Sequence, residues 1–335
     1  MNITYDSKDF KSDQPVRWCP GCGDHAVLNC LHKAMAKLGT TPSQNVVISG
    51  IGCSSRLPYY MNTYGFHTIH GRGAAIATGV KTANPALNVW LVTGDGDCLA
   101  IGGNHFIHAL RRNVNINVIL MNNRIYGLTK GQYSPTSMRG FVSKSSPYGT
   151  VEDPFEPAEL AFGARGTFFA RTLDVDLQNQ TDTLYEAAKH KGASVVEALV
   201  NCVIFNNGTH SGISGREFRA EKTINLKHGE KMIFGKDNNR GIVQDGFKLK
   251  AVTIGEDGYT IDDVLVHDAE TEDNTLHGML AMMKGDLPVA LGVIRAFDAP
   301  VYDESVHRQI EDVKNKKPQR KLRELLLSGD TWEVK

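Results

Sequence analysis

The sequence predicts an α/β fold in which a mainly parallel sheet carries helices on both faces. Short apolar runs bounded by glycine alternate with segments whose apolar residues recur every three and four positions. Such alternation is typical of strands that are buried between two helical layers. A chain of 335 residues is long enough to bury a sizeable core, and this pattern extends over residues 24–210.

The expected elements follow one another in order. The first helix begins near Asp24, which can cap it, and ends at Gly39, while Asn84-Pro85 ends the second helix. Each strand is a run of apolar residues that is too short for a helix of ordinary length. The expected helices are 24–38, 73–83, 103–112 and 177–190, and the expected strands are 45–50, 88–93, 115–121, 167–171 and 193–200.

Three parts are expected along the chain. Residues 1–23 read as an irregular N-terminal arm, 24–210 as the α/β domain, and 211–335 as an irregular C-terminal extension that makes subunit contacts. Little periodicity is visible between 210 and 260. Further on, a strand is expected at 288–294 and a charged helix at 304–327, which Pro318 interrupts.

Composition and charge exclude several classes of protein. Lys plus Arg and Asp plus Glu each number 37, so the formal net charge is zero and gives no electrostatic footprint for nucleic acid or a membrane surface. No apolar run approaches the roughly 18 residues of a membrane span. Residues 1–6 lack a basic region followed by an apolar stretch, the pattern of a secretory signal. We therefore expect a cytoplasmic enzyme.

Candidate ligand-binding residues follow three strands. Residues 50–54 (GIGCS) follow the first strand, 94–97 (GDGD) follow the second, and 122–127 (NNRIYG) follow the third. Ligands of parallel α/β sheets bind beyond the carboxyl ends of the strands. If the three strands are neighbours, a cysteine, an acidic Gly-rich turn and an amide pair share one edge of the sheet.

Residues 97–121 separate the Gly-Asp-Gly turn from the Asn-Asn pair. This arrangement resembles the diphosphate-binding signature of thiamine diphosphate enzymes. Mg²⁺ prefers six hard oxygens, and it would take a carboxylate oxygen of Asp95, the amide oxygen of Asn123 and the main-chain oxygen of Ile125, beside diphosphate and water. Gly94 and Gly96 would let the backbone approach the phosphates. The alternative is an ordinary turn and an ordinary loop.

The six cysteines fall into two groups. Cys19 and Cys22 flank Pro-Gly and can turn both sulfurs toward one ion or cluster, and Cys53 and Cys202 follow strands. The other two, Cys30 and Cys98, lie in apolar patterns and are expected to pack in the core. A structural zinc site or an unliganded redox pair are the alternatives to a cluster, whereas disulfides are disfavoured in a chain of this length without an export signal.

Several motifs in one order resemble the β subunit of the 2-oxoacid:ferredoxin oxidoreductases, over about residues 15–235. They are residues 18–23 (WCPGCG), 51–54 (IGCS), 70–72 (HGR), 94–97 (GDGD) and 122–132 (NNRIYGLTKGQ). The Thr-Lys-Gly-Gln form is most similar to the 2-oxoglutarate type. In that family the cysteine pair, the Gly-Cys-Ser cysteine and a late cysteine hold a 4Fe–4S cluster, and the matching residues are Cys19, Cys22, Cys53 and Cys202.

The resemblance implies a thiamine diphosphate-binding fold and a CoA-dependent oxidative decarboxylation. A 2-oxoacid, here 2-oxoglutarate, yields CO2 and an acyl-CoA (succinyl-CoA), electrons pass through the cluster to ferredoxin, and the reaction is reversible in principle. A separate α subunit is expected to carry the pyrimidine-binding layer and the activating Glu, in an α2β2 heterotetramer. Alternatives are a pyruvate or broad 2-oxoacid enzyme, a non-oxidative thiamine enzyme, and a zinc-stabilised non-catalytic scaffold subunit.

The resemblance also suggests which residues contact the coenzyme and the substrate. The second carboxylate of 2-oxoglutarate would be bound by Arg or Lys, and Arg56 and Lys130 are candidates, although a solvated or phosphate-facing base is an equal alternative for each. The residues expected to contact the coenzyme are Ile51, Gly52, Cys53, Ser54, His70, Gly94, Asp95, Gly96, Asp97, Asn123, Ile125, Gly127, Leu128 and Thr129.

Overall fold

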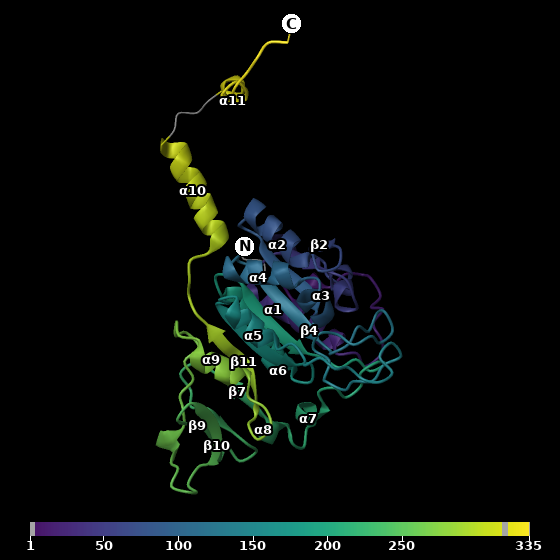
Figure 1. Cartoon of the computed structure of the whole chain (residues 1–335), viewed down its shortest axis with the longest axis vertical. Coiled ribbons are helices and arrows are strands. Elements are labelled where there is room, and N and C mark those ends of the chain that lie inside the picture. The colour runs from purple at the N-terminus through teal and green to yellow at the C-terminus, as the bar shows by residue number, and fades with distance from the viewer. Residues whose placement is uncertain (1–3, 317–320, 335) are drawn as a thin grey trace.

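A mainly parallel sheet of eight strands forms the centre of the molecule in the computed structural model, which describes residues 4–316 and 321–334. Its order is β2-β1-β3-β4-β6-β5-β11-β7, and only β5 and β11 pair antiparallel. Figure 1 shows this sheet in the middle of the molecule. The predicted fold class is confirmed. The strands are β1 (Asn45–Ser49), β2 (Tyr64–His67), β3 (Asn88–Gly94), β4 (Asn117–Asn122), β5 (Phe168–Leu173), β6 (Ser194–Leu199), β7 (Thr223–Leu226) and β11 (Val289–Ala296).

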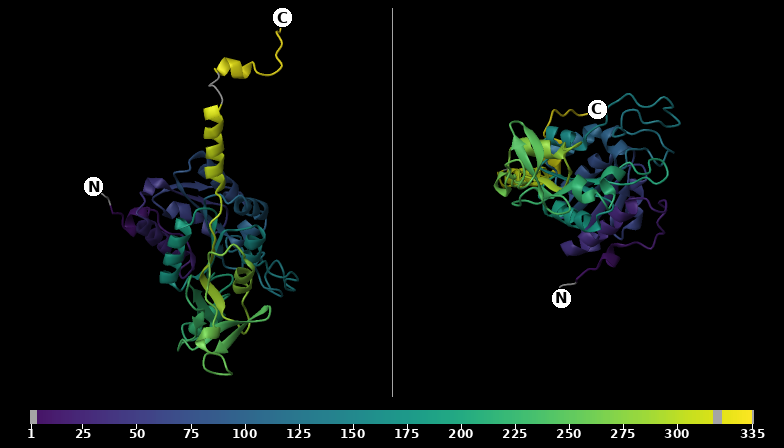
Figure 2. Two further views of the ribbon diagram at one scale, coloured as in Figure 1. Left: turned by 90° about the vertical axis from the view of Figure 1, so that its left-hand side faces the viewer. Right: turned by 90° about the horizontal axis from the view of Figure 1, so that it is seen from below.

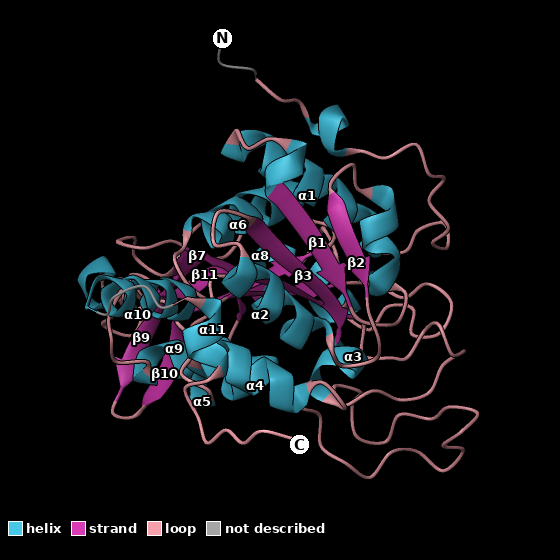
Figure 3. Cartoon of the chain, turned by 90° about the horizontal axis from the view of Figure 1, so that it is seen from above, coloured by secondary structure: helices cyan, strands magenta, loops and turns pink. Residues whose placement is uncertain are grey.

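Helices cover both faces of this sheet (Figure 3). Successive residues of one strand belong to two separate cores: Val47 packs in the core under α1 and α6, whereas Ile48 packs in the core under α2, α4, α5 and α9. Apolar side chains are therefore required on both faces of each central strand. The helices are α1 (Asp24–Leu38), α2 (Gly73–Ala83), α3 (Asp95–Leu99), α4 (Gly103–Arg111), α5 (Pro157–Gly163), α6 (Leu177–Lys189) and α9 (Thr275–Ala281).

The start of α1 differs from the expectation. Gly23, not Asp24, occupies the N-cap position, and Asp24 is the first helical residue, with its side chain buried. The main-chain N–H of Gly23 donates to the carbonyl oxygen of Asn201 at 3.0 Å, and a β-carbon at position 23 would overlap the Asp174 carboxylate. The N-terminal arm therefore packs so closely on the ends of β5 and β6 that only glycine fits.

Regular structure in residues 211–335 is more extensive than the irregular extension that the sequence suggested. β7 and β11 join the central sheet, and three further strands form an antiparallel sheet of their own. Its outer hairpin turns at Gly246-Phe247, between the paired residues Asp245 and Lys248, and Gly246 has a φ of 59°. Glycine at the first position of a two-residue hairpin loop is a turn signal in a region without clear periodicity. The strands are β8 (Ile233–Phe234), β9 (Arg240–Asp245) and β10 (Lys248–Thr253).

The C-terminal helices lead away from the central domain. α10 (Tyr302–Lys316) projects from it and α11 (Leu322–Leu326) lies beyond (Figure 2), while Pro318, expected to interrupt this helical stretch, is outside the described residues. Two short helices, α7 (Ser211–Ser214) and α8 (Arg219–Lys222), precede β7. Within residues 4–316 and 321–334, none of the helices combines the length and apolarity needed to cross a membrane. The 3-10 helices are η1 (Ser7–Phe10), η2 (Pro42–Gln44), η3 (Ser54–Tyr60) and η4 (Ile261–Asp263).

Candidate functional site

The predicted site residues meet at one edge of the central sheet. β1, β3, β4 and β6 are adjacent and parallel, so their carboxyl ends lie side by side. The Gly-Ile-Gly-Cys-Ser loop follows β1, the Gly-Asp-Gly turn leads into α3, and the Asn-Asn loop follows β4. Cys202 comes just after β6. The expectation that these strands are neighbours is confirmed.

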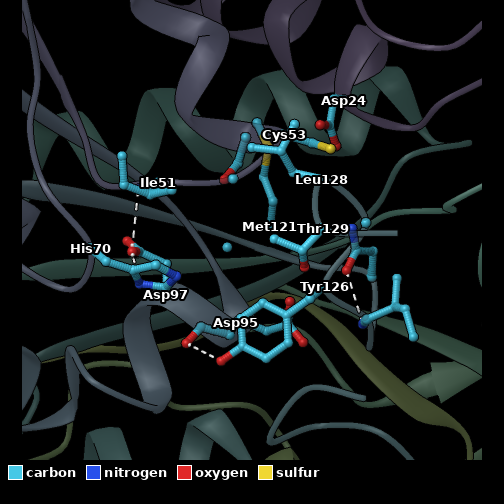
Figure 4. Close-up of a pocket in the computed structure, with 17 residues that line it drawn as sticks. Asp24, Ile51, Cys53, His70, Asp95, Asp97, Met121, Tyr126, Leu128 and Thr129 are labelled. Carbon is cyan, nitrogen blue, oxygen red and sulfur yellow. Dashed lines mark hydrogen bonds and ion pairs between the residues drawn. The ribbon is translucent and has the colours of Figure 1, made fainter. Parts of the chain in front are cut away.

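A cavity of about 80 Å³ lies between these loops. Every residue predicted to contact the coenzyme lines it, and so does Tyr126, which was also expected to line the thiamine (Figure 4). Asp24 and Met121 line it as well, although the sequence analysis had not assigned them to the coenzyme site. Asp24 lies on the same side as Cys53, and Asp95 lies on the opposite side. The coenzyme residues that were scattered over the sequence thus form one continuous lining.

Asp95 is a buried acid of this cavity that two hydroxyl side chains hold in place. It begins α3 directly after β3, is almost fully buried, and its Oδ2 accepts hydrogen bonds from Ser134 Oγ and Thr136 Oγ1, each at 2.5 Å. Burial raises the pKa of Asp95 to about 6 even though both hydroxyls lower it. A bound cation would compensate the cost of burying the ionised form.

The loop after β4 presents the other two predicted magnesium ligands. Asn123 Oδ1 accepts a hydrogen bond from the main-chain N–H of Ile125 at 3.1 Å, so the side chain closes a tight turn. Both residues line the cavity with Asp95. A carboxylate, an amide oxygen and a main-chain oxygen form a donor set of the hard type that Mg²⁺ requires.

Asp97 joins two loops of the site. Its Oδ1 accepts from the main-chain N–H groups of Ile51 at 3.2 Å and Gly71 at 2.8 Å, and it lies 2.8 Å from His70 Nδ1. Its Oδ2 accepts from Thr93 Oγ1 at 2.8 Å. The carboxylate is therefore saturated by protein donors, and it positions His70 and the loop after β1 at the cavity.

The four predicted cluster cysteines surround a second cavity, of about 180 Å³. Cys19 and Cys22 come from the N-terminal arm, and the indole N–H of Trp18 fastens this arm to the carbonyl oxygen of Cys53 at 2.7 Å. Cys202 completes the lining from the end of β6. In the part of the chain that the structure describes, no three His, Cys, Asp or Glu side chains are close enough together to hold a single metal ion.

The cysteine cavity and the coenzyme cavity share a wall. Cys53 and Gly127 line both of them. A β-carbon at Gly127 would lie 3.5 Å from Cys53 Sγ and 3.6 Å from Cys202 Sγ, so the main chain there runs against two of the sulfurs. A group held by the cysteines would consequently be separated from a ligand in the first cavity by little more than one peptide.

Cys22 and Cys53 are protonated in the absence of a bound cation. Burial raises the pKa of Cys53 to about 11, with the neighbouring Asp24 and Cys202 adding to the effect, and burial also raises the pKa of Cys22. Thiolates, not thiols, bind metals, so metal uptake would release protons here. Cys30 and Cys98 are buried elsewhere, as predicted.

The two basic residues predicted to bind substrate lie near the cysteines. Arg56 lines both the cysteine cavity and a neighbouring cavity of about 440 Å³, which also contacts Ile51, Tyr59 and His67. Lys130 lines only the cysteine cavity. Arg56 is thus the better placed of the two for a substrate beside the coenzyme, and Lys130 lies on the side of the cysteines.

Asp24 is a further acid of the site that the sequence analysis assigned only to helix capping. It is 2% exposed, and burial, with the nearby Asp174 as a further cause, raises its pKa to about 7. Its Oδ2 has no hydrogen-bond partner among the described residues, and the residue lines the coenzyme cavity. A buried polar atom without a partner indicates that a bound group supplies the missing contact. Its position directly after the Cys-Pro-Gly-Cys-Gly motif was the available signal.

Comparison with known proteins shows which family the chain belongs to. Residues 50–198 match the family described as "Thiamine pyrophosphate enzyme, C-terminal TPP binding domain". The chain is 47% identical over 331 residues to the 2-oxoglutarate oxidoreductase subunit KorB of Mycobacterium tuberculosis, covering 98% of this chain and 88% of that protein. It is 42% identical over 221 residues to the 2-oxoglutarate synthase subunit KorB of Methanothermobacter marburgensis, covering 65% and 78%, respectively.

A solved structure has the same fold over nearly the whole chain. It is the 2-oxoglutarate:ferredoxin oxidoreductase from Magnetococcus marinus with 2-oxoglutarate, coenzyme A and succinyl-CoA bound. The TM-score is 0.78 at 31% identity, covering 98% of this chain and 97% of that one. The chain therefore belongs to the family of thiamine diphosphate-dependent 2-oxoacid:ferredoxin oxidoreductase β subunits, and it resembles the KorB members of that family.

Proposed function

We propose that this subunit takes part in the CoA-dependent oxidative decarboxylation of 2-oxoglutarate to succinyl-CoA and CO2, with ferredoxin as the electron acceptor. The observation that supports this most is the wall shared by the two cavities at Cys53 and Gly127. Electron transfer from a coenzyme to a cluster needs such closeness, whereas a non-oxidative thiamine enzyme has no use for it. The reaction would run as a carboxylation where reduced ferredoxin is abundant.

The residues present fit thiamine diphosphate, Mg²⁺ and a 4Fe–4S cluster. Asp95, Asn123 and Ile125 would hold the cation, and the small Gly94 and Gly96 would let the diphosphate approach the main chain. When bound, the coenzyme supplies a nucleophilic carbon for decarboxylation and the cluster accepts electrons singly. The protein's own task is to position both groups and to exclude water.

The four cysteines are proposed to hold the cluster rather than zinc. Their cavity of about 180 Å³ offers more room than a single tetrahedral ion needs, since Zn–S bonds are about 2.3 Å long. All six cysteines are free of disulfides, which suits a reducing compartment, and we therefore propose a cytoplasmic location.

Arg56 is proposed to bind the distal carboxylate of the 2-oxoacid. It lines the cavity of about 440 Å³ that adjoins the coenzyme cavity at Ile51, Gly52 and Leu128. A guanidinium can bind a carboxylate through two parallel hydrogen bonds, which gives orientation as well as affinity. Lys130 remains a candidate that acts from the cluster side.

An α subunit would complete the site, in an α2β2 heterotetramer. A cavity of about 80 Å³ can take only the diphosphate end, because pockets for whole cofactors measure roughly 300–1,000 Å³. The loop after β4 also exposes several large apolar side chains, as an interaction surface does. These side chains are Met138, Val142, Tyr148, Val151 and Phe155. The α subunit would contribute the pyrimidine-binding layer and the activating Glu.

The test is metal and cofactor analysis of the complex of both subunits, purified without oxygen. We expect about four iron and four sulfide per β chain, bound thiamine diphosphate, and CoA-dependent ferredoxin reduction with 2-oxoglutarate. About one zinc without sulfide would overturn the redox mechanism and leave a zinc-stabilised subunit. Substantial turnover by the β chain alone would overturn the need for the α subunit.

A further inference from the structure

Three buried hydroxyl side chains lie in the long loop between β4 and α5, outside every motif that the sequence analysis recognised. Ser134 is 2% exposed, Thr136 is 1% exposed and Ser137 is 4% exposed. Loops normally run over the surface, and burying a hydroxyl is costly unless it is hydrogen-bonded. The hydrogen-bond partners of these hydroxyls therefore indicate why residues 134–137 are buried.

Two of the hydroxyls bind the same carboxylate oxygen. Ser134 Oγ and Thr136 Oγ1 both lie 2.5 Å from Asp95 Oδ2. Asp95 itself is 2% exposed, so solvent contributes almost nothing to its hydrogen bonding. Among the described residues, side-chain donors reach Oδ2 but not Oδ1, which leaves Oδ1 as the oxygen available to a cation.

The same segment also forms a hydrogen bond to the loop that follows β4. Ser137 Oγ donates to the carbonyl oxygen of Arg124 at 2.7 Å and accepts from the main-chain N–H of Ser134 at 2.8 Å. Thr136 Oγ1 lies 3.0 Å from Asn122 Oδ1. Arg124 directly follows Asn123, so the hydrogen bond from Ser137 holds the turn that presents Asn123 and Ile125.

The number of hydrogens available decides to which acceptor each hydroxyl donates. A Ser or Thr hydroxyl donates one hydrogen only. Ser137 gives its hydrogen to the Arg124 carbonyl, and Ser134 gives its hydrogen to Asp95. Thr136 faces two acceptors, and a hydrogen bond to an ionised carboxylate is about twice as strong as a neutral one, so it donates to Asp95.

We propose that Ser134, Thr136 and Ser137 form a clamp that positions the two separate halves of the magnesium site. Asp95 arrives at the end of β3 and the Asn123–Ile125 turn at the end of β4, and the clamp is bonded to both. Ser134, Thr136 and Ser137 are positioning residues, because they do not bind the cation themselves but hold the protein groups that bind it. The proposal rests on the proposed function, because it concerns the same cation and diphosphate.

The experiment uses the complex of both subunits with Ser134→Ala, Thr136→Val and the conservative Thr136→Ser. Calorimetry measures the apparent Kd of Mg²⁺ in the presence of thiamine diphosphate, and steady-state kinetics measure kcat at saturating Mg²⁺. Mutation of the residues that hydrogen-bond to metal ligands typically lowers metal affinity by roughly 10–100-fold. We expect losses of that size for Ser134→Ala and Thr136→Val, recovery in Thr136→Ser, and kcat within a few-fold of wild type. Ser145→Ala, an exposed serine of the same loop, is the matched control.

Other results of this experiment would distinguish a failure of the clamp from a failure of the proposed function. Wild-type Mg²⁺ affinity in both Ser134→Ala and Thr136→Val would overturn the clamp. A variant that loses its iron together with its Mg²⁺ affinity would also overturn it, because that pattern reports a collapse of the fold. Failure of the wild-type complex to bind Mg²⁺ with thiamine diphosphate would instead contradict the proposed function.

Discussion

The ring of Tyr126 lies against Gly96, and its hydroxyl donates to the Gly96 carbonyl oxygen at 3.0 Å. This contact interlocks the turn after β3 with the loop after β4. Burial raises the pKa of Tyr126 to about 12, and the nearby Asp95 and Asp97 contribute, so the hydroxyl remains a donor at neutral pH. The second glycine of the Gly-Asp-Gly-Asp turn, Gly96, is thus required by a neighbouring side chain.

Replacing Gly96 by alanine is expected to disrupt the coenzyme site. A β-carbon there would overlap the Tyr126 ring, and overpacking of this kind costs about 1–3 kcal/mol. We expect weaker thiamine diphosphate binding by calorimetry and a lower free energy of unfolding. Gly79→Ala is the control, because nothing lies within 4 Å of its β-carbon and alanine favours the interior of α2. Equal behaviour of the two variants would contradict the interlock.

Replacing Cys202 by alanine is expected to remove the cluster. Cys202 lines the cavity with Cys19, Cys22 and Cys53, and three thiolates leave one iron without a protein ligand. Iron and sulfide analysis of the anaerobic complex should show a loss of most of both, with ferredoxin reduction abolished. The matched variant Cys98→Ala removes a buried thiol that does not line the cavity and should retain its iron. Full iron content in Cys202→Ala would exclude it as a ligand.

Replacing Arg56 by glutamine is expected to alter substrate preference. A charge-assisted hydrogen bond contributes about 1.5–3 kcal/mol, so kcat/KM for 2-oxoglutarate should fall by roughly 10–100-fold. The value for pyruvate, which lacks the second carboxylate, should change much less. Arg111→Gln, at the exposed end of α4, serves as the control. Equal losses for both substrates would remove Arg56 as the selector.

The buried His32 of α1 is expected to make the fold sensitive to acid. Burial lowers the pKa of His32 to about 4 from its ordinary 6.5. Between these pH values the unfolded chain binds a proton that the folded chain does not, so the free energy of unfolding decreases as pH falls from 6.5 to 4. Urea unfolding of the full chain across this window should show a shallower pH dependence for His32→Gln, by up to about 1.4 kcal/mol per pH unit. Identical slopes for wild type and variant would show that His32 does not titrate in this way.

Periodicity in the sequence was sufficient to predict the parallel sheet and the edge at which the coenzyme cavity lies, and the family resemblance added the individual residues that line it. The reason is local: residues at the carboxyl ends of parallel neighbours share one edge wherever the helices between them are regular. The helix over residues 24–38 and its end at Gly39 follow from the same local physics, and both occur as predicted. The Cys-Pro-Gly-Cys motif, the two cysteines that follow strands and the family resemblance together predicted which four thiols meet around one cavity.

Tertiary structure alone decided which side chains support that site. Ser134 and Thr136 lie about 40 residues along the chain from Asp95, in a loop without periodicity, and only packing brings them to its carboxylate. Asp24 had the pattern of a helix cap, but Gly23 took that position because a β-carbon would overlap Asp174. The β8–β10 sheet was missed because its short strands carry too few apolar residues to set a period. Local patterns predict elements and their ends, whereas contacts across long sequence separations depend on how those elements pack.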